Sequence, residues 1–243
     1  MPAIRSLLTT MLFALAPVAA AWAQSAVERR VVVEEQGWEL IGDLSLPAES
    51  GKRPAVLMLN AANRDRTEYV ALARELARRG VASLRLDLRG HGESVNRGRF
   101  VPGEVPRSPL IWDSEADVLA ALRFLRAQPG IDGSRIGVVG ASYSGEEMAE
   151  AGRIGGYARA YVALSPGSFS DESVDGIDPS GAAWLFVASR DERYLQEITA
   201  AVRGRSRTVE LLVLPGVEHG TRLLGSTPGL PERLAVWLAT ALR

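Results

Sequence analysis

Cysteine is absent from the 243-residue chain, and lysine and histidine are scarce. Without cysteine there is no disulfide, no thiolate metal site, no iron–sulfur cluster and no Cys nucleophile. Lys52 is the only lysine among 28 basic residues, so the other 27 are arginine, which cannot form a Schiff base. His91 and His219 are the only histidines, so a histidine base has two candidates. This residue set is poor in metal ligands, and we expect neither a metal nor a cofactor.

The charges nearly cancel, with 28 basic and 29 acidic residues and a net charge of −1. Such a balance gives no uniform positive field, so we expect no nucleic-acid partner. With 47% hydrophobic residues and no repeat or change in composition along the chain, the sequence predicts one globular domain over residues 24–243.

Residues 1–23 have the layout of a secretory signal peptide. A positive start is followed by an apolar run and by Ala21-Trp22-Ala23, so cleavage is expected between Ala23 and Gln24. The alternative is an uncleaved anchor, but the run is shorter than the roughly 18 to 20 apolar residues that span a membrane. We therefore expect a secreted or periplasmic protein that leaves the membrane after cleavage.

Strand-like and helix-like segments alternate along the rest of the chain. This alternation predicts a mostly parallel sheet with helices on both faces and an antiparallel hairpin at its start. The expected strands are 29–34, 38–46, 55–59, 81–86, 135–139, 160–164, 183–188 and 209–214, and the expected helices are 67–79, 113–128, 145–154, 192–202 and 231–242.

Reactive side chains follow three of these strands, at the edge where ligands collect in open α/β sheets. Ser142 lies in Gly140-Ala-Ser-Tyr-Ser-Gly145, which is typical of a sharp strand-to-helix turn with an exposed serine, although a plain glycine-rich turn would look similar. Asp191 follows the strand expected over 183–188. An acid at this place can orient a histidine or simply cap a helix, and Glu192 competes with Asp191 for either role. His219 lies beside Gly220 in the loop after the strand expected over 209–214. Together they run in the order nucleophile, acid, base.

The motifs resemble the α/β-hydrolase superfamily, in particular dienelactone-hydrolase-like and small serine esterase members. The resemblance rests on the serine turn, on Asp87-Leu-Arg-Gly-His-Gly-Glu-Ser94, on Ala188-Ser-Arg-Asp191 and on Gly216-Val-Glu-His-Gly220. It implies the α/β-hydrolase fold with an eight-stranded sheet and no cap domain. It also implies that Ser142 is the nucleophile, His219 the base and Asp191 the acid that orients it, with the backbone amides of Tyr143 and Ala62 as the oxyanion hole.

Two positions depart from this family pattern. Asn60-Ala61-Ala62-Asn63 stands where relatives often carry His-Gly-x-Gly, and Ser144 stands at a usual glycine. Alanine disfavours positive φ, so the loop of Ala62 is expected to differ in shape. The missing cysteine excludes the thiol nucleophile of true dienelactone hydrolases. His91 is expected to be structural or to line the rim of the site.

The leading hypothesis is an exported serine hydrolase that cleaves small carboxylic esters through an acyl-enzyme. Peptidase or acyltransferase activity on the same residues is an alternative, because a fold does not determine its substrate. A catalytically silent binding protein is another, suggested by the altered loop at residues 60–63. The sequence does not decide the acyl and alcohol groups or the oligomeric state.

Overall fold

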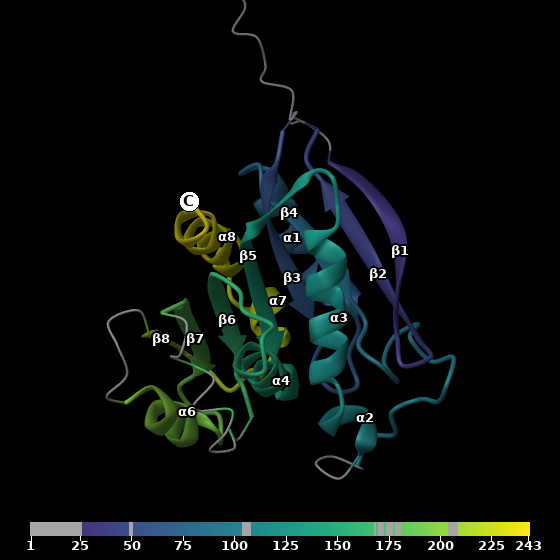
Figure 1. Ribbon diagram of the computed structural model, residues 1–243. Helices are drawn as coiled ribbons and strands as arrows, with labels where there is room; N and C mark the ends of the chain where they lie inside the picture. The colour runs from purple at the N-terminus through teal and green to yellow at the C-terminus, as the bar shows by residue number, and fades with distance from the viewer. Residues whose placement is uncertain are drawn as a thin grey trace, which may run out of the picture.

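The computed structural model describes residues 26–48, 51–103, 108–167, 169, 173, 177, 181–203 and 209–243. Eight strands form one sheet in the order β1-β2-β4-β3-β5-β6-β7-β8 (Figure 1). The strands are β1 (Val27–Glu35), β2 (Trp38–Leu46), β3 (Arg53–Leu59), β4 (Ala82–Leu86), β5 (Ile131–Ala141), β6 (Ala160–Leu164), β7 (Ala183–Ser189) and β8 (Val209–Leu214). β2 is antiparallel to both β1 and β4, and the remaining neighbours are parallel.

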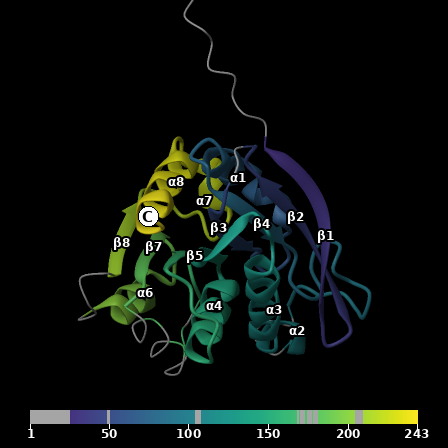
Figure 2. The ribbon, with the colours of Figure 1, turned by 45° about the horizontal axis from the view of Figure 1, so that its top comes forward.

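Helices cover both faces of the sheet, as Figure 2 shows. They are η1 (Arg66–Tyr69), α1 (Val70–Ala77), α2 (Pro109–Trp112), α3 (Glu115–Arg126), α4 (Tyr143–Arg153), α6 (Leu195–Val202), α7 (Arg222–Ser226) and α8 (Leu230–Ala241). One hydrophobic core lies between the sheet and α3, α4 and α6, and it includes Leu122, Met148 and Ile198. A second core lies between the sheet and α1, α7 and α8, with Leu76 and Leu238 fully buried. Strands between two such layers must be apolar on both sides, which explains their continuous hydrophobic runs.

The predicted fold class is confirmed, including the antiparallel hairpin and all eight strands. Two predicted helix starts were wrong. The helix predicted from Glu192 begins at Leu195, as α6, and the helix predicted from Asp113 begins at Glu115, as α3. A separate turn, α2, begins at Pro109, where the Ser108 side chain accepts a hydrogen bond from the amide of Leu110. Asp113 ends this turn, and α3 starts two residues later.

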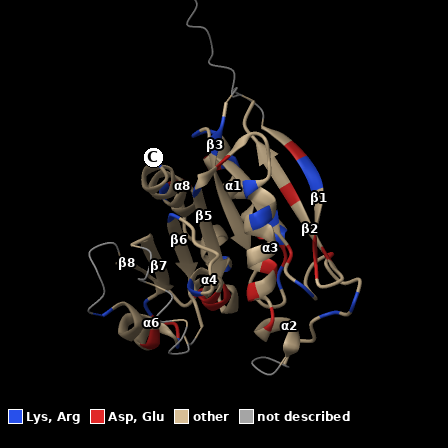
Figure 3. Ribbon diagram, in the orientation of Figure 1, with Lys and Arg blue, Asp and Glu red and all other residues tan. Residues whose placement is uncertain are grey.

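Strand β1 forms one edge of the sheet and carries charges of both signs along its length (Figure 3). Charged side chains on an edge strand discourage pairing with another chain. No helix in the described part of the chain is long and apolar enough to cross a membrane. The expected signal peptide, residues 1–23, lies outside the described residues.

The carboxyl ends of the central strands share one edge of the sheet. Leu59 at the end of β3 is level with Gly140 of β5, and Ser189 at the end of β7 is level with Leu214 of β8. The loops that follow these strands carry Ala62, Ser142, Glu192 and His219. The register of the parallel strands is therefore what brings these distant parts of the sequence together.

Candidate active site

Ser142 stands in a sharp turn between β5 and α4. Its backbone has φ 55° and ψ −126°, a conformation that a non-glycine residue rarely adopts. The Ser142 amide donates to the Leu164 carbonyl at 3.0 Å, and the Ser142 carbonyl accepts from the Gly145 amide at 3.0 Å. The surrounding hydrogen bonds thus hold a strained serine at the start of a helix, as the sequence motif predicted.

Two small residues allow this turn. A Cβ atom on Gly140 would lie 2.4 Å from the Ser144 carbonyl oxygen, so no larger residue fits without moving the helix. Ser144 is fully buried, and its hydroxyl oxygen accepts from the Ala141 amide at 2.7 Å and lies 3.2 Å from the Leu59 carbonyl oxygen. Serine at the usual glycine position therefore fits, and its hydroxyl ties the end of β3 to the turn.

His219 lies between Ser142 and a carboxylate. Its Nε2 atom is 3.0 Å from Ser142 Oγ, and its Nδ1 atom is 2.8 Å from Glu192 Oε2. A carboxylate accepts hydrogen bonds, so the proton resides on Nδ1 and leaves Nε2 able to take the serine proton. The Ser189 amide donates to Glu192 Oε1 at 3.0 Å, which holds the second carboxylate oxygen.

The expectation that Asp191 contacts His219 is wrong. Asp191 is exposed, and its amide donates to the Gly216 carbonyl at 3.0 Å, whereas Glu192 is 9% exposed and turns inward to the imidazole. The prediction counted three residues from Ala188, but β7 continues to Ser189. Three residues beyond the true strand end is Glu192.

The loop after β3 approaches the serine. A Cβ atom on Gly220 would lie 3.6 Å from Ala61 Cβ and 3.9 Å from Ser142 Cβ, so the loops of Ala61, Ser142 and His219 meet here. The positive φ of this loop falls on Asn63, at 57°, and asparagine tolerates that region, so the loop turns without glycine. The amides of Ala62 and Tyr143 remain the predicted oxyanion donors.

Two buried ion pairs hold the loop after β4. Arg66 bonds Asp87 at 2.6 Å, Asp43 at 2.9 Å and Glu93 at 2.7 Å. Burial alone would lower the pKa of Arg66, but its bonds to these carboxylates raise it. A Cβ atom on Gly92 would lie 2.1 Å from Asp87 Oδ2, so glycine is required at this close approach.

Arg89 forms the second pair, with Asp117 of α3, at 2.6 Å from Nη2 to Oδ1. Its amide also donates to Asp117 Oδ2 at 2.9 Å. Sequence reasoning found neither pair. The only signal for them was the motif around Arg89, which by itself does not point to a distant aspartate.

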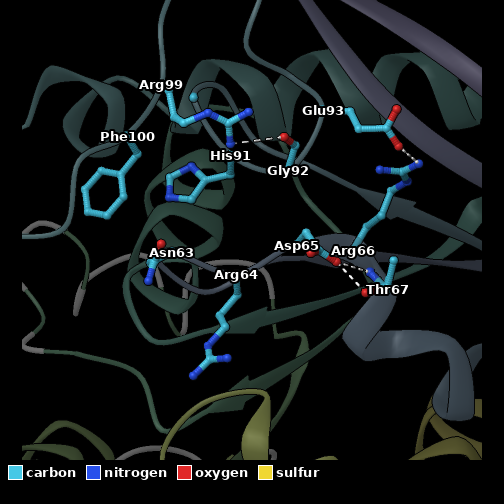
Figure 4. A pocket seen from close by; sticks show the side chains of 11 residues that line it. Asn63, Arg64, Asp65, Arg66, Thr67, His91, Gly92, Glu93, Arg99 and Phe100 are labelled. Atoms are coloured by element: carbon cyan, nitrogen blue, oxygen red, sulfur yellow. Dashed lines mark hydrogen bonds and ion pairs between the residues drawn. The ribbon is translucent and has the colours of Figure 1, made fainter.

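His91 is 2% exposed and stacks between Phe100 and Tyr143, with ring centroids 4.9 and 5.5 Å away. Its Nδ1 atom lies 2.9 Å from the Arg89 carbonyl oxygen, which can only accept, so Nδ1 carries the proton. Burial lowers the pKa of His91 to about 4 and keeps the ring neutral. The ring also lines a cavity with Asn63, Arg64, Asp65 and Arg99 (Figure 4).

A family model for the X-Pro dipeptidyl-peptidase (S15 family) matches residues 36–213, more than half of the chain. The chain belongs to this S15 family. No curated protein matches it. In the described part of the chain, no group of three His, Asp or Glu side chains could hold a metal ion.

Several solved structures share the fold of this S15 member. A hypothetical protein from Pseudomonas aeruginosa has a TM-score of 0.72 at 16% identity and covers 99% of this chain and 100% of its own. A dienelactone hydrolase from Anabaena variabilis has a TM-score of 0.69 at 19% identity, with 90% and 100% covered. An esterase from Pyrobaculum calidifontis has a TM-score of 0.66 at 15% identity, with 89% and 86% covered. The family match and these folds place the chain among the α/β serine hydrolases.

Proposed function

We propose that the protein hydrolyses carboxylic esters through an acyl-enzyme on Ser142, with His219 as base and Glu192 as the acid that orients it. The observation that carries this proposal is the continuous hydrogen-bonded line from Glu192 Oε2 through His219 to Ser142 Oγ, at 2.8 and 3.0 Å. Both distances lie in the range for proton transfer. Serine is a weak nucleophile on its own, and an adjacent oriented base activates it.

The reaction proceeds in two balanced halves. Ser142 Oγ attacks the ester carbonyl carbon while its proton moves to His219 Nε2, and the carbonyl oxygen becomes an oxyanion held by the amides of Ala62 and Tyr143. The alcohol leaves with the proton from His219. A water molecule then gives a proton to His219 and attacks the acyl carbon. The bond between that carbon and Ser142 Oγ breaks, the acid leaves, and His219 returns the proton to Ser142 Oγ. One oxyanion donor contributes about 2.7 to 4 kcal/mol to such a barrier.

Peptidase activity is the second candidate, because the matched family is described as an X-Pro dipeptidyl-peptidase. The cavity next to Ala62 argues against it. Arg64 and Arg99 line that cavity, and the free ammonium group of a peptide N-terminus would meet their guanidinium groups there. The dienelactone hydrolase and the esterase with the same fold are compatible with ester chemistry.

A panel of p-nitrophenyl esters of increasing chain length tests the proposal, with glycyl-prolyl p-nitroanilide as the peptide counterpart. Ser142→Ala should abolish turnover. Glu192→Gln should lower kcat by about 10⁴, because a glutamine can hold the wrong imidazole tautomer, whereas the neighbouring Asp191→Asn serves as matched control and should change little. A larger loss for Asp191→Asn would overturn the assignment of the acid, and faster cleavage of the anilide would favour the peptidase.

Export also remains a proposal, since it rests on residues 1–23. Sequencing the N-terminus of the protein recovered from the periplasm of a bacterial host should give Gln24 as the first residue. Retention of Met1 in a cytoplasmic fraction would contradict cleavage.

A further inference from the structure

The cavity of about 390 Å³ adjoins the candidate active site at two points. Asn63 on its wall directly follows Ala62, the predicted oxyanion donor. On the other wall, the ring of His91 stacks on Tyr143, which follows Ser142. The volume lies within the range of small-ligand pockets, and the two neighbouring residues place the cavity beside the candidate active site.

Four polar side chains on the cavity wall keep bonding capacity. In the described part of the chain, Asn63 has no hydrogen-bond partner, and Arg64 has one long ion pair, 3.4 Å, to Glu68. Arg99 donates a single long bond, 3.5 Å, to the Gly92 carbonyl. Asp65 uses Oδ1 for the amide and hydroxyl of Thr67, and no described residue bonds its Oδ2.

The other charged groups of the cavity are already neutralised. Arg66 is bound by three carboxylates, and Glu93 is paired with both Arg30 and Arg66. What remains is a mixture of donors from Arg64, Arg99 and Asn63 and acceptors from Asp65 and Asn63. Figure 4 shows these side chains around the same space, together with the rings of His91 and Phe100.

This mixture selects the chemistry of the occupant. An ammonium group would meet the guanidinium groups of Arg64 and Arg99, and a carboxylate or phosphate would meet the open oxygen of Asp65. A hydroxyl group both donates and accepts, so several hydroxyl groups on one ring satisfy both kinds of wall residue. The rings of His91 and Phe100 also line the cavity, and since they are stacked on each other, it is their edges that offer apolar contact to the C–H groups of such a ring.

We propose that this cavity binds a hydroxyl-rich group, a sugar or polyol ring, which forms part of the ester cleaved at Ser142. The inference deepens the proposed function and rests on it. Asn63 and Arg99 are its main hydrogen-bonding residues, and the side chains of both are exposed. Asn63 lies next to the predicted oxyanion donor Ala62, and Arg99 lies next to Phe100, which stacks on His91.

A matched pair of esters tests the specificity. A monoacetate of methyl xyloside and cyclohexyl acetate share the acetyl group and a six-membered ring, and they differ in the ring oxygen and hydroxyl groups. The wild-type kcat/KM should favour the xyloside ester by about tenfold or more, because sites built for hydroxyl groups discriminate strongly. Arg99→Ala and Asn63→Gly should each reduce this ratio by at least about threefold, the effect of one lost hydrogen bond.

Arg97→Ala is the control variant. Arg97 lies in the same loop, but its side chain donates to the Gln36 carbonyl at 2.8 Å and does not line the cavity. The ratio should stay at its wild-type value. A wild-type ratio near one, or a ratio that Arg99→Ala and Asn63→Gly leave unchanged, would overturn the proposal.

A binding measurement separates this inference from the proposed reaction. The chain has only two histidines, so the imidazole NMR signals of His91 and His219 are resolved by a single His219→Asn assignment spectrum. In Ser142→Ala, methyl xyloside should shift the His91 signals and cyclohexanol should not. If the wild type cleaves cyclohexyl acetate but methyl xyloside does not shift the His91 signals, the sugar site alone is refuted. Shifts without cleavage of any ester would refute the ester hydrolase alone.

Discussion

Glu147 is a buried carboxyl group outside the proposed catalytic line, and its removal should stabilise the protein. It lies on α4 with 7% exposure, near Ser114 and Glu115 at the start of α3. Burial raises its pKa to about 9, and the charges of Glu115 and Glu146 add to the rise. Both helices carry further acidic residues (Figure 3).

The pKa values give the sign and size of the effect. The unfolded carboxyl loses its proton near 4.5 and the folded one near 9, so the folded state holds one more proton between these values. The stability contributed by Glu147 therefore falls as the pH rises through this window. At about 1.4 kcal/mol per pKa unit, the carboxyl costs about 3 kcal/mol at pH 7, and Glu147→Gln should recover it. This corresponds to a Tm increase of roughly 6 to 12 °C.

Urea unfolding of the wild type and Glu147→Gln should be compared at about pH 5 and about pH 8, where the gain should grow by about 4 kcal/mol between the two values. Other titrating groups cancel in this comparison. Glu197→Gln, which replaces an exposed glutamate of α6, is the control. Its free energy of unfolding should differ from that of the wild type by the same amount at both pH values. A gain that stays constant with pH would refute the reasoning for Glu147.

Three further predictions concern the turn, a buried pair and His91. Gly140→Ala should lower ester turnover by about 100-fold, because a new Cβ displaces α4 and Ser142. Gly130 has open space around it, so Gly130→Ala should leave turnover unchanged. Equal turnover of the two variants would contradict the close approach at Gly140. Asp117→Ala leaves Arg89 buried without its carboxylate and should cost about 3 to 5 kcal/mol in urea unfolding. The partly exposed Asp132→Ala should cost less than about 1 kcal/mol, and equal losses would contradict the prediction. In an NMR titration His91 should change charge near pH 4, because burial lowers its pKa, and a transition above pH 6 would contradict its neutral state.

The strand order and the serine turn could be predicted because they follow from local patterns. Apolar runs of strand length mark buried strands, and Gly140 and Ser142 lie in a short motif whose spacing sets its own geometry. The exchange of Asp191 for Glu192 shows where such reasoning ends. Which of the two acids contacts His219 depends on whether β7 ends at Ala188 or at Ser189. That end is set by pairing with β8, which local propensity does not reveal.

The cavity shows the same limit. Asn63 and Arg99 are 36 positions apart in sequence, and their shared space depends on the ion pairs of Arg66 and Arg89 that hold the intervening loops. His91 was expected to be structural or to line the rim, and its stacking between Phe100 and Tyr143 is consistent with both. Its neutral state follows from burial, which only the packed structure supplies.

The central claim is that Ser142 is a nucleophile activated by His219. A fluorophosphonate probe reacts with such a serine, and intact-mass and peptide mass spectrometry report where it attaches. We expect one label per chain, on the peptide that contains Ser142, with no label in Ser142→Ala and slow labelling in His219→Asn. Equal labelling of the wild type and Ser142→Ala, or no labelling of the folded wild type, would contradict it.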